Sequence, residues 1–177
     1  LSAQYIVLAG GSRSASFPGL TPDHDAVLDS TDLLNVPAVP ESLIIVGAGA
    51  IGLEMADFFS AMGSAVTVVE AAPQLAPTED TDIAQELQKL LGKAGRTCLA
   101  GIKASSLLTR DGQAVLTLED GRELTAAKAL VAVGRKPNTD GLEAEKAGCA
   151  LNRRGYVAVD DYLKAAPTVF AIGDING

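Results

Sequence analysis

Hydrophobic runs along the chain alternate between the patterns of strands and of helices. Aliphatic runs at residues 43–46 and 129–133, and a largely aliphatic run at residues 65–69, predict buried strands, as in a parallel sheet. Residues 51–62 and 80–91 instead carry apolar side chains at helical spacing, and a glycine follows each segment. This alternation predicts an α/β fold with a Rossmann-like parallel sheet and helices on both faces.

A group of short strands interrupts this order in the second half of the chain. They are expected at residues 97–99, 106–109, 115–118 and 123–125, and the Asp-Gly pairs between the later ones are typical of hairpin turns. We therefore expect an antiparallel β insert within the parallel domain.

The remaining segments are less regular. Residues 5–8 predict a short buried strand, and residues 157–159 and 169–172 predict two more. The polar stretch from residue 10 to 39 shows little periodicity. The exception within this stretch is a helical turn at residues 30–34, whose leading Ser or Thr is expected to accept hydrogen bonds from backbone N–H groups.

The composition is that of an ordinary globular protein. Of the 177 residues, 47% are hydrophobic, 20% are charged and only 4% are aromatic, so the core must consist of small aliphatic side chains. The formal net charge of −8 and the lack of a basic run argue against a nucleic-acid partner. A nucleotide ligand is still compatible with this charge, because backbone N–H groups at a helix N-terminus bind phosphate without basic side chains.

Few residues suit metal or redox chemistry. Cys98 and Cys149 lie far apart and form no CxxC pair, so we expect buried small side chains rather than a metal site or a redox dithiol. His24 lies in a polar turn and is expected at the surface. The lack of a long apolar run or a signal peptide predicts a cytoplasmic protein with no membrane partner. Because the chain opens on Leu1 rather than Met, we expect a piece of a larger protein.

The strongest chemical signal is the turn after the first aliphatic strand, Gly47-Ala48-Gly49-Ala50-Ile51-Gly52. In a dinucleotide-binding turn of this kind, the first glycine allows the tight bend and the second leaves room for the pyrophosphate. The third glycine lets the helix lie close to the strand. The N–H groups of the new helix would then bind the phosphates, so these six residues are the predicted pyrophosphate site.

Three acids have candidate roles. Glu70 ends the second strand roughly 20 residues beyond the glycines, where an acid binds the adenosine ribose and repels a 2′-phosphate. With no Arg or Lys expected nearby, we predict NAD in preference to NADP. Glu54 either only complements the helix dipole or lies near the nicotinamide. Asp174, just past the last strand, would cap a helix or bind a hydroxylated ligand.

Four segments occur in the order found in a known family, at residues 45–54, 68–70, 133–139 and 171–174. Through them the chain resembles the pyridine nucleotide-disulfide oxidoreductases over nearly its whole length. Within that family it is most similar to the dihydrolipoamide dehydrogenases. The resemblance implies an FAD/NAD(P)-binding fold and a flavoprotein in which electrons pass from a dithiol, through a redox disulfide and FAD, to NAD⁺.

The resemblance also implies a division of the chain. Residues 1–38 would be a strand and linker re-entering from an FAD domain, residues 39–140 the NAD-binding Rossmann domain, and residues 141–177 a return segment toward the FAD domain. The sequence has no first FAD-binding GxGxxG, no CxxxxC pair and no dimerisation domain with a catalytic His. We therefore expect the chain to bind NAD without catalysing dithiol oxidation, and its parent to be a homodimer acting on a lipoyl-bearing or other disulfide substrate.

Cofactor contacts beyond the glycine turn are implied by the same resemblance. The family's backbone approaches NAD at the positions of Ala104 and Gly134, and Glu54 falls near the nicotinamide and the flavin. Gly10 departs from the family, which has Thr at this position. The implied FAD contacts, with the ribityl chain among them, fall at Gly11, Ser12 and Asp174.

Other functions remain open from the sequence. A different member of the family, such as an NADH oxidase, a transhydrogenase or a mercuric reductase, would share this domain. A free-standing NAD-sensing module would respond to the nucleotide by a change of shape or of partner rather than by hydride transfer.

Overall fold

The computed structural model describes residues 2–177, whose contacts divide the chain into two compact units. The larger unit holds residues 15–134, and the smaller one combines residues 2–14 with residues 135–177. The divisions expected from the sequence lie near residues 38 and 140 instead. Residues 15–38 belong to the larger unit because a short strand and a helix within them pack on its sheet.

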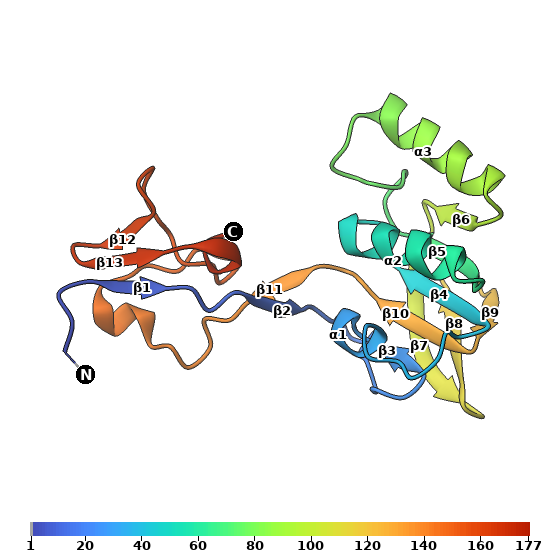
Figure 1. Cartoon of the computed structure of the whole chain (residues 1–177), viewed down its shortest axis with the longest axis horizontal. Coiled ribbons are helices and arrows are strands. Elements are labelled where there is room, and N and C mark those ends of the chain that lie inside the picture. The colour runs from blue at the N-terminus through green and yellow to red at the C-terminus, as the bar shows by residue number, and fades with distance from the viewer. Residues whose placement is uncertain (1) are drawn as a thin grey trace. The chain divides into compact units, whose positions relative to one another are not determined.

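A five-stranded parallel sheet forms the centre of the larger unit (Figure 1). Every neighbouring pair of its strands is parallel, so the aliphatic runs form the buried strands that they predict. Residues 97–99 correct one expectation, because they pair with this sheet rather than with the antiparallel insert. The strand order across the sheet is β3 (Val27–Leu28), β10 (Lys128–Val131), β4 (Ser42–Val46), β5 (Ala65–Glu70) and β6 (Thr97–Ala100).

Helices cover one face of this sheet. Leu33, Phe59 and Leu91, one from each helix, share a buried cluster with Leu43 and Ile45 of β4. The two longer helices follow the segments expected from the apolar spacing. The three helices are α1 (Ser30–Leu33), α2 (Ala50–Ala61) and α3 (Thr81–Lys93).

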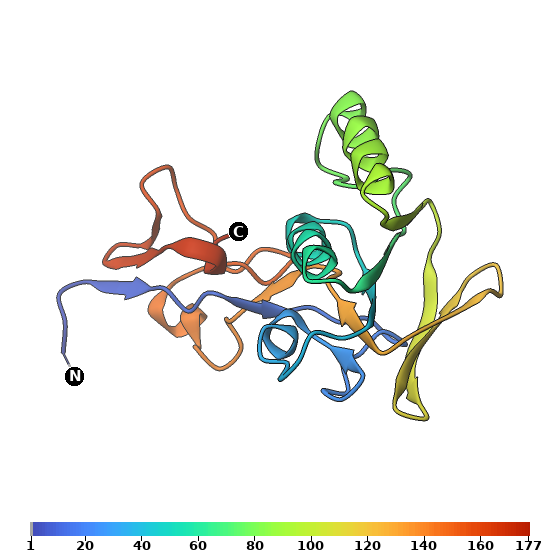
Figure 2. The ribbon, with the colours of Figure 1, turned by 45° about the vertical axis from the view of Figure 1, so that its right-hand side comes forward.

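The opposite face is covered by a second sheet, which is antiparallel (Figure 2). Its Leu107 and Leu116 share a buried cluster with Ile44 and Val46 of β4. The expected α/β class with an antiparallel insert is confirmed, but the helices expected on this second face are replaced by the insert. Its strands are β7 (Ala104–Arg110), β8 (Gln113–Leu118) and β9 (Glu123–Ala126).

The smaller unit is built from short strands. Residues 6–8 form the expected strand, but Ile6 and Val7 are 45% and 57% exposed rather than buried. This strand lies at the edge of its sheet and pairs only with β13 (Val169–Ala171). Residues 157–159 make one isolated bridge, from Val157 to Leu151, and not a strand. The elements are β1 (Ile6–Leu8), β2 (Ser12–Ser14), β11 (Arg135–Pro137), β12 (Lys164–Ala166), β13 (Val169–Ala171) and 3₁₀ turns at Ala144–Ala147 and Gly173–Ile175.

Within residues 2–177, no helix is both long enough and apolar enough to cross a bilayer.

Backbone atoms approach one another very closely in the turn between β4 and α2. A Cβ atom on Gly52 would lie 2.0 Å from the carbonyl oxygen of Gly47, and a Cβ atom on Gly47 would lie 2.3 Å from the carbonyl oxygen of Ala132. Gly47 also has a φ of 105°, which side-chain-bearing residues rarely adopt. Glycine at both positions lets α2 begin directly against the strand ends.

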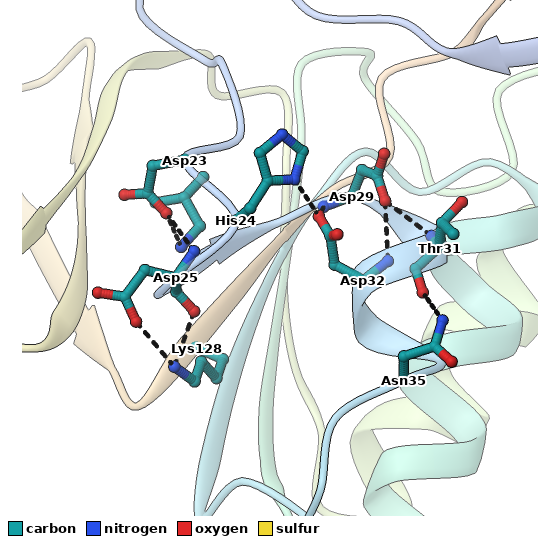
Figure 3. A network of polar contacts seen from close by, with 9 residues as sticks. Asp23, His24, Asp25, Asp29, Thr31, Asp32, Asn35 and Lys128 are labelled. Atoms are coloured by element: carbon teal, nitrogen blue, oxygen red, sulfur yellow. Dashed lines mark hydrogen bonds and ion pairs between the residues drawn. The ribbon is translucent and has the colours of Figure 1, made fainter.

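The cap of α1 differs from the expected hydroxyl cap. Asp29 is the N-cap, and its carboxylate accepts hydrogen bonds from the N–H groups of Thr31 and Asp32. Asp32 in turn accepts the N–H of Asp29 at 3.0 Å, which completes a capping box (Figure 3). An acid can take the place of the expected Ser or Thr, because a carboxylate, like a hydroxyl group, supplies the acceptor oxygen that an N-cap requires.

His24 contacts this cap. It is exposed, as expected, and its Nδ1 lies 2.7 Å from a carboxylate oxygen of Asp32 (Figure 3). The hydrogen bond to Asp32 and the charge of that carboxylate raise the pKa of His24. Burial acts to raise the pKa of Asp32, but the hydrogen bonds from the Asp29 N–H and from His24 outweigh it, and the pKa is lowered.

We expect Gly52→Ala to lower the free energy of unfolding by at least about 2 kcal/mol, because backbone must move to admit the methyl group. Gly92→Ala is the matched control. Gly92 lies within α3 with no atom within 4 Å of an added Cβ, so alanine there should stabilise by roughly 0.5–1 kcal/mol. Urea unfolding of both variants measures the difference. Equal effects of the two substitutions would contradict the close approach.

We expect His24 to titrate above its ordinary pKa of about 6.5, and Asp32→Asn to lower that pKa. As the chain's single histidine, His24 gives ring signals without overlap in a proton NMR titration. A raised pKa in the folded state means that the ion pair contributes stability below the ordinary histidine pKa and loses it as the pH rises through the folded value. The thermal midpoint of His24→Gln should therefore fall below that of the unmodified chain in mild acid and converge with it at alkaline pH.

Candidate dinucleotide-binding site

A cavity of about 530 Å³ lies at the carboxyl ends of β4, β5 and β10, entirely within the larger unit. This is where ligands bind in open α/β sheets, because the loops after the strands diverge there. The residues that line it are Phe17, Pro18, Leu20, Val46, Gly47, Gly49, Val69, Glu70, Ala71, Pro77, Ile102, Lys103, Ala104, Ala132, Val133 and Gly134.

The residues expected to bind NAD divide into two groups in the structure. The lining includes Gly47, Gly49, Glu70, Ala104 and Gly134, so these five lie around one cavity. The others do not line it; they belong to the turn and the first turns of α2, and Glu54 is exposed there. This second group consists of Ala48, Ala50, Ile51, Gly52 and Glu54.

Gly49 is open toward the cavity. A Cβ atom built on it meets no atom within 4 Å, in contrast to Gly47 and Gly52. It is the N-cap of α2 and makes no side-chain capping bond. The first N–H groups of a helix have no partner within the helix, so the positive end of α2 offers donors to an anion at this point.

Glu70 has a structural role that the sequence alone did not reveal. One oxygen of its carboxylate accepts the N–H of Ala48 at 2.7 Å, and the other accepts the N–H of Ala72 at 2.7 Å. The acid thereby joins the glycine turn to the loop after β5. A carboxylate has about four acceptor positions, so those that remain can still accept hydroxyl groups of a ligand.

Lys103 corrects the expectation that no basic residue lies near Glu70. It lines the same cavity, although 33 positions separate the two residues in the chain. Parallel pairing of β5 with β6 brings the loop after β6 next to the loop after β5. Ile102 donates its N–H to the carbonyl oxygen of Glu70 at 3.1 Å, which fixes this approach.

The irregular stretch before β3 also lines the cavity, through Phe17, Pro18 and Leu20. This segment is held by a hydrogen bond of 2.8 Å that the N–H of Leu107 in β7 donates to the carbonyl oxygen of Gly19. No local pattern in the sequence indicates this placement, because the contact joins residues nearly 90 positions apart.

The expected FAD residues gather in the smaller unit. Ser12 donates its hydroxyl to Asp174 at 2.6 Å, and Arg135 donates to that hydroxyl at 2.6 Å. The side chain of Asp174 is 61% exposed, and Gly11 beside Ser12 has a φ of 64°. Gly10 is crowded, because a Cβ atom there would lie 3.3 Å from the carbonyl oxygen of Asn138. Gly10, where the resemblance implies Thr, therefore has little room for a side chain.

Neither metal nor thiol chemistry is supported by the part of the chain that the structure describes. No cluster of His, Cys, Asp or Glu suited to a metal ion occurs in residues 2–177. Both cysteines are free; Cys149 is buried as expected, whereas Cys98 is only partly buried. Burial raises the pKa of both thiols, which disfavours the reactive thiolate.

Comparison with known proteins agrees with this geometry. Dihydrolipoyl dehydrogenase 3 of Pseudomonas putida is 38% identical over 181 residues, which cover 99% of this chain and 39% of the relative. The structure of LpdA from Mycobacterium tuberculosis superposes with a TM-score of 0.90 at 32% identity, covering 99% of this chain and 38% of that one. An NAD-dependent persulfide reductase from A. fulgidus gives a TM-score of 0.85 at 27% identity, with 99% and 34% coverage.

The chain thus spans about two fifths of the length of the curated relatives that it matches. The family model for pyridine nucleotide-disulphide oxidoreductases matches residues 1–177, the whole of the chain. Since the four ordered sequence segments, the fold and the relatives all agree, this chain belongs to the pyridine nucleotide-disulphide oxidoreductase family.

Proposed function

We propose that residues 15–134 bind NAD(H) as the nucleotide domain of a flavoprotein disulfide oxidoreductase, most similar to dihydrolipoyl dehydrogenase. The observation that carries this proposal is one cavity that holds both the open N-terminus of α2 at Gly49 and the carboxylate of Glu70. A dinucleotide needs both groups, since its pyrophosphate requires donors and its adenosine ribose requires an acceptor.

Each group has a defined part in this proposal. The N–H groups at the start of α2 bind the pyrophosphate, and the lack of a side chain at Gly49 lets the backbone approach it. Glu70, held by two backbone N–H groups, accepts the ribose hydroxyls from a fixed position. The backbone at Ala104 and Gly134 borders the rest of the dinucleotide.

The parent protein would also bind FAD, which carries electrons between a redox disulfide and NAD when it is bound. The exposed carboxylate of Asp174, next to the hydroxyl of Ser12, fits a contact with a hydroxylated chain such as the ribityl group. We propose the reaction dihydrolipoamide + NAD⁺ → lipoamide + NADH for a homodimeric parent. The present chain would not catalyse it, because Cys98 and Cys149 cannot form the CxxxxC redox pair.

A second candidate is a parent that acts on a different sulfur substrate. The likeness to the NAD-dependent persulfide reductase supports it, since 99% of this chain superposes on part of that protein. The substrate would be decided by parts of the parent outside this domain, while NAD binding would be common to both candidates.

We expect NADH to bind the chain at least tenfold more tightly than NADPH, a difference of about 1.4 kcal/mol. Glu70→Gln should narrow this ratio, because the neutral amide no longer repels a 2′-phosphate. Calorimetric titration with each nucleotide measures both values, and the melting temperature of the variant reports any loss from the bonds to Ala48 and Ala72. Absence of binding to the unmodified chain would sink the proposed function.

We expect Gly49→Ala to weaken NADH binding by at least tenfold while lowering the melting temperature only slightly, because alanine is a poorer N-cap than glycine. The added methyl group enters open space, so the fold tolerates it, but it occupies the position of the pyrophosphate. Gly92→Ala, in α3 and away from the cavity, is the control for adding a methyl group to a glycine outside the candidate site. Unchanged NADH affinity in Gly49→Ala would show that the pyrophosphate lies elsewhere.

A further inference from the structure

Only two polar residues of the described chain line the cavity. Glu70 and Lys103 carry the charged groups, and the other lining residues are aliphatic, aromatic, proline or glycine. Any recognition of a polar ligand by side chains must therefore come from this acid and this base. Glu70 has the role described above, whereas Lys103 has none.

Lys103 is held next to Glu70 by the backbone. Gly101 donates its N–H to the carbonyl oxygen of Ala72 at 2.8 Å, and Ile102 donates to that of Glu70 at 3.1 Å, so the two loops run side by side. The carbonyl oxygen of Lys103 accepts the N–H of Glu119 at 2.9 Å. These bonds fix the backbone of Lys103 at the end of the cavity where Glu70, the proposed ribose-binding acid, lies.

The charge of Lys103 is not used elsewhere in residues 2–177. Its residue is exposed, and no acidic side chain of the described chain forms an ion pair with its ammonium group. Lys128, by comparison, pairs with Asp25. An unpaired ammonium group on a residue that lines the cavity is free to interact with an anionic ligand.

The surrounding negative charge would make a cation at the cavity favourable for nucleotide binding. Seven basic and sixteen acidic residues fall between residues 15 and 134, so the larger unit repels a dinucleotide that carries two phosphates. The dipole of α2 acts only over its first turn. A single cation at the adenosine end offsets this repulsion where Glu70 would otherwise add to it.

We propose that Lys103 is a second determinant of nucleotide binding, whose ammonium group attracts the phosphates of the adenosine half of the dinucleotide. This inference rests on the proposed NAD(H) function. Glu70 then discriminates against a 2′-phosphate, while Lys103 raises the affinity for both nucleotides and does so more for NADPH, which carries the additional charge. The NADPH binding gained in Glu70→Gln depends on Lys103.

The test is a set of NADH and NADPH titrations of the 177-residue chain. The variants are Lys103→Gln, Glu70→Gln and the double variant, with Lys93→Gln as the control that removes an exposed lysine of α3 outside the cavity. We expect Lys103→Gln to weaken NADH binding about threefold, as for a solvated ion pair. In the Glu70→Gln background it should weaken NADPH binding about tenfold, because the 2′-phosphate adds charge.

Titrations at several salt concentrations distinguish an effect of the Lys103 charge from an effect of its packing. The affinity of the unmodified chain should fall with ionic strength more steeply than that of Lys103→Gln. NADH binding that Lys103→Gln and Lys93→Gln alter equally would overturn the role of Lys103 and leave the proposed function standing. Failure of the unmodified chain to bind either nucleotide would overturn both.

Discussion

The approach of α2 to the ends of β4 and β10 is the constraint on which the larger unit depends. Gly52 lies against the carbonyl oxygen of Gly47, and Gly47 lies against that of Ala132, with no room for a Cβ atom at either glycine. The helix can therefore bury Phe59 on the sheet and, at the same time, direct its first N–H groups to the strand ends. The packing of the core and the candidate anion site follow from one turn.

Glu70 connects this turn to its surroundings. Because its carboxylate accepts the N–H groups of Ala48 and Ala72, the glycine turn and the loop after β5 are joined through a side chain rather than through the backbone alone. The same acid lines the cavity. The carboxylate is consequently part of the fold, held in one orientation by these two backbone N–H groups.

The antiparallel sheet contributes more than a cover for the second face. It buries Leu107 and Leu116 against β4, and it begins at Ala104, which lines the cavity. Through the bond from Leu107 to Gly19 it also holds the segment that includes Phe17. An insert that replaces helices on this face thus supplies walls of the candidate site.

The sequence by itself determined the parallel strands, the two long helices, the glycine turn and the acid at the end of β5, because these depend on periodicity and on residues close together in the chain. It did not determine that β6 joins the parallel sheet, that a sheet covers the second face, or that β1 lies exposed at an edge. Nor did it bring Lys103 to Glu70 or Ser12 to Asp174. Only the tertiary structure decided these placements, because each arises from strand pairing between distant segments, for which local side-chain patterns carry no information.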